Sequence, residues 1–189
     1  MRGRKKPAPL NEDGLYHYAV KLLGQQMRTV AEVKRLLRRR LEPDESGKPG
    51  EAGEARLNAV VARLHEDRYL DDVGYAKDYA KLRQENASLG KRRVEQDLMR
   101  KGVAKATIKT TLDAAYEGVG EEELARRHLE RKRIRKPANE KEAARVARML
   151  MRAGFSMGAI VHILKKWDVD DDALGAIESA EADEDEPDA

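Results

Sequence analysis

Histidine, carboxylate and glycine residues are the first candidates for chemistry in this sequence, and their spacing does not support a catalytic site. No two of the four histidines lie three or four residues apart, as paired imidazole ligands on one helix would. There is no cysteine, which excludes a thiol nucleophile. Gly90 and Lys91 lack the further glycine and the Ser/Thr of a phosphate-binding loop. Neighbouring acids such as Asp71 and Asp72 could hold magnesium, but acids at a helix start are more often caps. We therefore expect no enzyme, no metal and no cofactor.

Basic residues are the alternative source of chemistry, because clustered Lys and Arg side chains bind phosphate and carboxylate groups. The 189-residue chain has a net charge of +3, but seven acids and no basic residue lie in residues 178–189, which leaves residues 1–177 with 38 basic against 28 acidic residues. A basic body predicts a polyanionic or acidic partner, and we expect the acidic C-terminal end to compete with that partner for the basic body. The predicted partner- or DNA-binding residues form three clusters: Arg35, Arg38, Arg39 and Arg40; Lys91, Arg92, Arg93, Arg100, Lys101 and Lys105; and Arg126, Arg127, Arg131, Lys132, Arg133 and Arg135.

A helical hairpin that occurs twice would position the second cluster. Residues 93–112 align without a gap with residues 145–164, and eight of the twenty positions are identical. In each copy a helix ends at a glycine, Gly102 or Gly154, since only glycine takes the left-handed C-cap conformation without steric cost. A second helix follows that keeps Ile and Leu four residues apart on one face. A more divergent third copy lies near the N-terminus, at residues 33–64.

This repeat predicts an all-α fold of nine helices, in which three tandem three-helix modules form an elongated, monomeric array with disordered termini. A capping box at Thr29 and Glu32 and a cap at Asn139 should start two of the helices. No apolar run approaches the roughly 18 residues of a membrane span, and the absence of cysteine suits a reducing compartment, so we expect a cytoplasmic protein. The predicted parts are a basic N-terminal tail over residues 1–12, module 1 over 13–70 with a Pro/Gly-rich insertion at 43–53, module 2 over 71–118, module 3 over 119–169, and an acidic C-terminal tail over 170–189.

Three stretches of the sequence, in this order, resemble the RecX family of bacterial regulators of the RecA recombinase. They are YLDDVGYA at residues 69–76, GKRRVEQDLMRKGV at residues 90–103 and AGFSMGAI at residues 153–160. The resemblance implies three three-helix modules that bind the RecA filament on DNA and modulate, mainly inhibit, its activity in recombination, DNA repair and the SOS response. One departure from the family pattern is Arg68, where the family tends to place glycine before the tyrosine.

The main alternative is a helical protein that binds single- or double-stranded DNA non-specifically and acts independently of a recombinase. Gly102 lies between two short helices, as in a helix-turn-helix, and Lys105 and Lys109 lie on the second of them. That helix lacks the Asn, Gln and Arg side chains that make bidentate contacts with bases, so sequence-specific recognition is not expected. An RNA-binding helical repeat is a third possibility, weakened by the small number of aromatic residues for base stacking.

Overall fold

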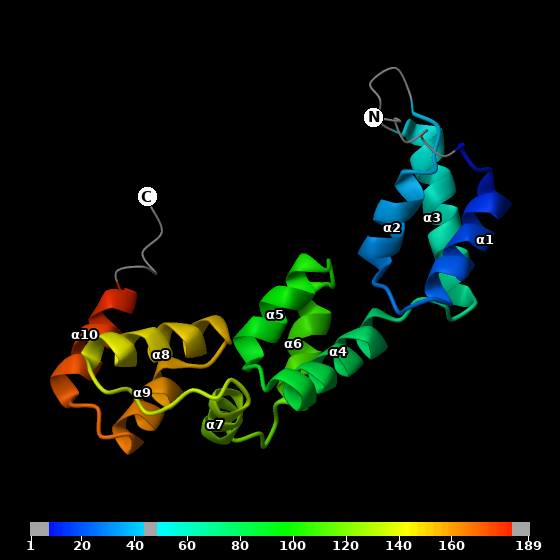
Figure 1. Ribbon diagram of the computed structural model, residues 1–189. Coiled ribbons are helices and arrows are strands. Elements are labelled where there is room, and N and C mark those ends of the chain that lie inside the picture. The colour runs from blue at the N-terminus through cyan, green and yellow to red at the C-terminus, as the bar shows by residue number, and fades with distance from the viewer. Residues whose placement is uncertain (1–7, 44–48, 183–189) are drawn as a thin grey trace. The chain divides into compact units, whose positions relative to one another are not determined.

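The structure is a computed structural model, and it describes residues 8–43 and 49–182. In those two ranges all regular elements are helices, apart from an isolated bridge between Pro43 and Pro49. The predicted all-α class is therefore confirmed. The helices of the described residues, shown in Figure 1, are α1 (Glu12–Leu23), α2 (Val30–Arg38), α3 (Glu51–Glu66), α4 (Asp72–Ala87), α5 (Lys91–Arg100), α6 (Lys105–Ala115), α7 (Glu121–Arg131), α8 (Glu140–Arg152), α9 (Met157–Lys166) and α10 (Asp171–Ala182).

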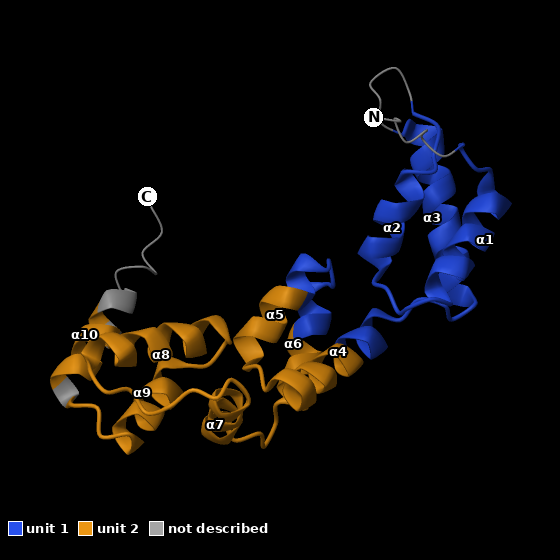
Figure 2. Ribbon diagram, viewed as in Figure 1, with its two compact units in different colours: residues 1–76, 98–108 blue, residues 77–97, 109–189 orange. Residues whose placement is uncertain are grey.

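The chain divides into two compact units, which Figure 2 shows in different colours. Unit 1 consists of residues 1–76 and 98–108, and unit 2 consists of residues 77–97 and 109–189. Helices α4, α5 and α6 each have residues in both units.

Unit 1 is built on α3, against which both α1 and α2 pack. Helix α2 carries Val33 and Leu37 into the core, as their spacing predicts. The capping box at its start is confirmed, because the Thr29 hydroxyl accepts a hydrogen bond of 3.1 Å from the Glu32 amide and the Glu32 carboxylate accepts one of 3.2 Å from the Thr29 amide. The fully buried core residues of unit 1 include Leu15, Ala19, Val33, Leu37, Leu57 and Leu64.

Unit 2 contains the larger core, in which α9 packs against α7 and α8. Asn139 caps α8, accepting a hydrogen bond of 2.9 Å from the Glu142 amide, as the sequence predicts. Phe155, from the loop between α8 and α9, is among its largest fully buried side chains. The other buried residues of this core include Leu124, Leu129, Leu150, Ile160 and Leu164.

Both predicted glycine caps are confirmed. Gly102 has φ +79° and Gly154 has φ +88°, which is the left-handed conformation that glycine adopts without steric cost. After each glycine the chain turns back on its helix, with Val103 donating to the Leu98 carbonyl at 3.1 Å and Phe155 donating to the Leu150 carbonyl at 3.2 Å.

The C-terminal part of the chain differs from the sequence prediction. The sequence predicts an acidic tail from residue 170, but residues 171–182 form α10, which packs on α8 and α9. Ala173, Leu174 and Ile177 lie on one face of this helix and are buried, so the apolar spacing prevails over the acidic composition. Residues 183–189 and the start of the predicted N-terminal tail, residues 1–7, lie outside the described residues.

The predicted insertion at residues 43–53 also changes. Helix α3 begins at Glu51, so its first turn takes up the last residues of that stretch. Residues 44–48 of the insertion lie outside the described part of the chain.

Candidate interaction surface

The side chain of Thr29 joins α2 to the loop between α5 and α6 within unit 1. Its Oγ1 donates a hydrogen bond of 2.7 Å to the carbonyl oxygen of Lys101, in addition to accepting the capping bond from Glu32. The next residue, Gly102, approaches α2 so closely that a Cβ there would lie 2.4 Å from the Cβ of Ala31. The glycine is therefore needed twice, for its positive φ and for this close approach.

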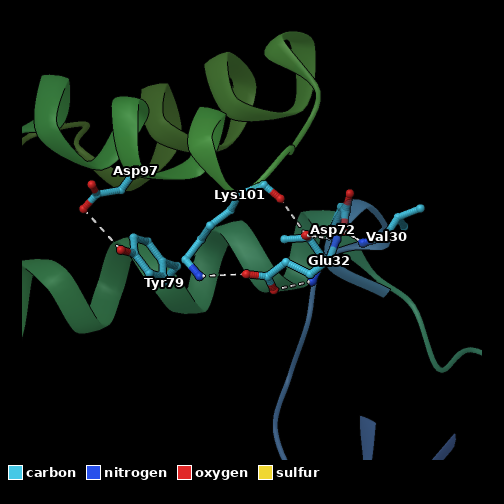
Figure 3. Close-up of polar contacts among 7 residues, drawn as sticks. Val30, Glu32, Asp72, Tyr79, Asp97 and Lys101 are labelled. Carbon is cyan, nitrogen blue, oxygen red and sulfur yellow. Dashed lines mark hydrogen bonds and ion pairs between the residues drawn. The ribbon is translucent and has the colours of Figure 1, made fainter. Parts of the chain in front are cut away.

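Lys101 was predicted to bind a partner, but its side chain takes part in this same contact. Its Nζ lies 3.2 Å from Oε1 of Glu32 and 5.5 Å from the ring centre of Tyr75. A hydrogen bond with Tyr75 is the main cause that raises the pKa of the Lys101 ammonium above its ordinary value, and a hydrogen bond with Glu32 raises it further. The Asp72 carboxylate adds a hydrogen bond of 2.9 Å from the Val30 amide, and Figure 3 shows both acids beside the start of α2.

We call this contact, in which the residue before one helix binds the loop of the next repeat beside its glycine, a joint. A second joint lies in unit 2, between the start of α5 and the loop between α8 and α9. The amide of Gly90 donates a hydrogen bond of 2.8 Å to the carbonyl oxygen of Ala153. A Cβ on Gly90 would lie 2.2 Å from the Gly154 carbonyl oxygen, and one on Gly154 would lie 2.2 Å from the Arg93 amide nitrogen. In both joints the acceptor is the carbonyl oxygen of the residue before the left-handed glycine, which is Lys101 or Ala153. The donor is the residue before the second helix of the preceding repeat, which is Thr29 or Gly90.

The predicted cluster on α2 is only partly available to a partner. Arg35 and Arg39 are exposed, whereas Arg38 makes two hydrogen bonds with Glu54 of α3, at 2.7 and 3.0 Å. The bond to Glu54 raises the pKa of the Arg38 guanidinium, and the same bond lowers the pKa of the Glu54 carboxyl. Arg40 is half-buried, and its guanidinium lies 5.0 Å from the ring centre of Tyr18.

Half of the predicted cluster around α5, namely Lys91, Arg93 and Lys101, is ion-paired. Lys91 bonds to Asp113 of α6, and this hydrogen bond lowers the pKa of the Asp113 carboxyl. Arg93 lies 3.3 Å from Asp97, which also accepts a hydrogen bond of 3.2 Å from Tyr79, as Figure 3 shows. The other members, Arg92, Arg100 and Lys105, are exposed.

The predicted cluster on α7 divides into an ion-paired half and an open half. Arg126 bonds to both Glu123 and Glu130, and Arg127 lies 3.8 Å from Glu123. Arg131 donates to the carbonyl oxygens of Glu85 and Asn86 at the end of α4. Lys132, Arg133 and Arg135 follow the helix, are exposed, and make no ion pair with the described residues.

The structure adds a basic surface that the sequence analysis missed, on the outer face of α8. Arg145, Arg148 and Arg152 are exposed there and make no ion pair with any described residue. The repeat contained a signal for them, because Arg145 and Arg152 are identical to Arg93 and Arg100 while the acid Asp97 is replaced by methionine.

Within the described ranges there is no group of three His, Cys, Asp or Glu residues that could hold a metal ion. The buried His128 packs edge-on against Phe155, and its Nδ1 lies 2.9 Å from the Ala87 carbonyl oxygen.

No described helix is long and apolar enough to cross a membrane. What the chain offers to other molecules is a set of charged helix faces on modules joined through glycine hairpins, the arrangement of a helical repeat protein.

Comparison with known proteins identifies the family. The models of the second and third three-helix domains of RecX match residues 71–112 and 120–164. A Regulatory protein RecX from Myxococcus xanthus is 34% identical over 166 residues, which cover 83% of this chain and 87% of the relative. One from Mycolicibacterium vanbaalenii is 32% identical over 72% of this chain and 73% of the relative. The chain belongs to the RecX family.

Two solved structures share the fold. A crystal structure of regulatory protein RecX has a TM-score of 0.63 at 22% identity, and the match covers 82% of this chain and 71% of that one. The crystal structure of RecX from Lactobacillus salivarius has a TM-score of 0.60 at 20% identity, with 83% of this chain and 96% of that one covered.

Proposed function

We propose that this protein binds the RecA recombinase filament on DNA and modulates it, mainly by inhibition, in recombination and DNA repair in the cytoplasm. The observation that carries the proposal is the 34% identity to a Regulatory protein RecX over 87% of that relative's length. The protein acts by binding, as a monomer, without a cofactor or a reaction of its own.

The surface of the two units supports a binding role. The basic side chains that have no carboxylate partner in the described residues, among them Arg35, Arg39 and Lys132, lie at exposed positions on helix faces or just after a helix. Guanidinium groups bind carboxylate and phosphate bidentately, so such faces suit a filament that offers both acidic protein surface and DNA.

A DNA-binding protein that acts without a recombinase is the second candidate. Lys105 and Lys109 are exposed on α6, where they can contact phosphate. The same helix carries no Asn, Gln or Arg, which favours non-specific contact over reading of bases.

The test is ATP turnover by RecA filaments assembled on single-stranded DNA. Added to such filaments, the protein should lower turnover at ratios well below one per RecA protomer, and it should hydrolyse no ATP by itself. A protein that only competes for DNA should instead act in proportion to the DNA that it covers, and its effect should vanish when DNA is in excess. Unchanged turnover at saturating protein would refute the proposal.

A matched pair of glycine variants tests whether the joined modules are needed. Gly154→Ala places a methyl group against the backbone of Arg93, whereas Gly158→Ala points into open space. We expect Gly154→Ala to weaken inhibition and Gly158→Ala to preserve it. Equal inhibition by both variants would show that the joint in unit 2 has no part in the activity.

A further inference from the structure

Helix α8 carries a row of arginines that has lost the acids found in its repeat partner α5. At the aligned positions, Arg93 and Asp97 of α5 become Arg145 and Met149 of α8, and Gln96 becomes Arg148. In α5 the Arg93 charge is balanced by Asp97 at 3.3 Å. Over the ten aligned residues, 143–152, α8 contains three arginines and no acid. The acids of α8, Glu140 and Glu142, both lie in its first turn, and none balances the arginines within residues 143–152.

These arginines line one side of a groove in unit 2. The groove has a volume of about 730 Å³, and its other side is formed by the segment that leads into α8, with Arg135 and Lys136. Lys136 bonds to Asp168 at 2.7 Å, whereas Arg135 has no ion pair with the described residues. Glu142 is the one acid among the lining residues, and its carboxylate accepts a hydrogen bond of 2.8 Å from the Ala138 amide. Basic side chains therefore dominate both walls.

The groove lies at a position that this repeat already uses for docking. In unit 2 the loop around Gly154 docks on α5 at Gly90 and Arg93. The aligned positions of α8 are Glu142 and Arg145, and both line the groove. A Cβ at the Gly90 position would lie 2.2 Å from the Gly154 carbonyl oxygen, so the glutamate at the aligned position of α8 cannot make the same close contact with a glycine hairpin.

We propose that this groove binds the phosphate backbone of a nucleic acid. Arg145 and Arg152 are seven residues apart, or about 10 Å along the helix, over which one strand of a duplex presents about three phosphates. All three side chains on α8 are arginine, whose planar fork binds phosphate oxygens in pairs. The inference extends the proposed function, since a regulator of a DNA-bound filament would also bind DNA directly. The groove is tested without the recombinase, so the DNA site can be refuted while the proposed function stands.

The experiment is a salt series of binding isotherms with a fluorescein-labelled DNA duplex of mixed sequence. The variant Arg145→Gln/Arg148→Gln/Arg152→Gln should bind at least tenfold more weakly at low salt. Its slope of log affinity against log salt should be shallower by about 2 to 3, because each lost phosphate contact removes about 0.9. Unchanged affinity and slope would overturn the proposal.

A charge-matched control distinguishes direct contact between the groove arginines and DNA from a general effect of the protein's positive charge. Lys77→Gln/Lys81→Gln/Arg83→Gln removes the same charge from exposed positions of α4 in the same unit, and it should lose no more than about twofold. Equal losses from the two triple variants would mean that total charge alone decides, which also overturns the proposal. The variant Arg145→Lys/Arg148→Lys/Arg152→Lys keeps the charge, so it should keep most of the salt slope but lose several-fold in affinity, because lysine lacks the planar fork. If the glutamine variant does not fold, unchanged affinity of the lysine variant overturns the proposal.

Discussion

The hydroxyl oxygen of Thr29 lies 2.7 Å from the carbonyl oxygen of Lys101, which is 72 positions further along the chain. Thr29 is fully buried, and the same oxygen accepts the capping bond from the Glu32 amide. One side chain therefore both starts α2 and holds the loop of the next repeat against it.

Replacing Thr29 with valine should remove both bonds while preserving the shape of the side chain. We expect the free energy of unfolding to fall by about 2 kcal/mol, since a lost cap costs about 1 kcal/mol and the carbonyl loses a buried partner. Thr29→Ser keeps the hydroxyl and should lose clearly less. Urea unfolding followed by circular dichroism measures both variants, and coincident curves for the two would show that the hydroxyl contributes nothing.

Three glycines separate the cost of a steric clash from the cost of backbone strain. Gly90 has a Cβ clash at an ordinary φ, Gly118 has φ +70° with no neighbour within 4 Å, and Gly158 has neither constraint. Gly118→Ala should cost about 1 kcal/mol from the left-handed conformation alone. Gly90→Ala should cost more, because backbone atoms of the joint must move, and Gly158→Ala should cost least. Any other order of melting temperatures would contradict this account of the joint.

Arg68 has φ +59° and follows the C-cap of α3. Tyr69 donates to the Leu64 carbonyl at 2.9 Å, which is the pattern that normally places glycine at position 68. Arg68→Gly should therefore raise the free energy of unfolding by about 0.5 to 1 kcal/mol. The gain comes from relief of the left-handed strain, and it is reduced because glycine gives the unfolded chain more conformational freedom. Arg68→Ala keeps the strain and should bring no such gain, and thermal melts of the two variants check the difference.

Burial raises the pKa of Tyr116 to about 12, although a hydrogen bond with Gln84 acts in the opposite direction. The phenol donates to the Leu89 carbonyl at 2.9 Å. Because the pKa is 10.0 in the unfolded chain, the unfolded state ionises first, and this part of the stability is lost as pH rises from 10 towards 12. In a spectrophotometric titration Tyr116→Phe should remove a late ionisation step, while Tyr69→Phe, at an exposed position, should leave that step in place.

The acidic C-terminus should act in two separable ways. A chain ending at Ala182 keeps α10 and lacks five of the seven terminal acids, so at low salt it should bind DNA several-fold more tightly, with the gain fading as salt screens the charges. A chain ending at Asp170 also loses Leu174 and Ile177 from the core and should unfold about 2 kcal/mol more easily. Identical DNA isotherms for the full chain and the chain ending at Ala182 would rule out competition by the tail.

Much of the fold can be predicted because its signals are local. The capping box at Thr29 and the left-handed caps at Gly102 and Gly154 each depend on a few neighbouring residues, and all three are confirmed. Helix α10 was missed because the acidic composition of residues 171–182 outweighed the spacing of its apolar residues, Leu174 among them.

The predicted partner residues remain predictions, and the structure shows why sequence ranks them poorly. Whether an arginine is open depends on which acid the fold brings near it. Arg38 meets Glu54 only because α2 packs on α3, and Lys91 meets Asp113 across two helices. The arginines of residues 143–152, which no acid of that stretch balances, are noticed only when the two repeat copies are compared position by position.

Both joints between repeats end on a main-chain carbonyl, that of Lys101 or of Ala153, next to a glycine. Because the acceptor is a backbone atom and the donor is a single residue, Thr29 or Gly90, each joint places few demands on the side chains of the outward-facing positions. The outer face of a module can therefore be exchanged for that of another repeat of the same length without redesigning the joint, provided that the glycine and its neighbouring carbonyl are kept. The chain is in this sense a scaffold for modular grafting, in which recognition and assembly can be altered independently.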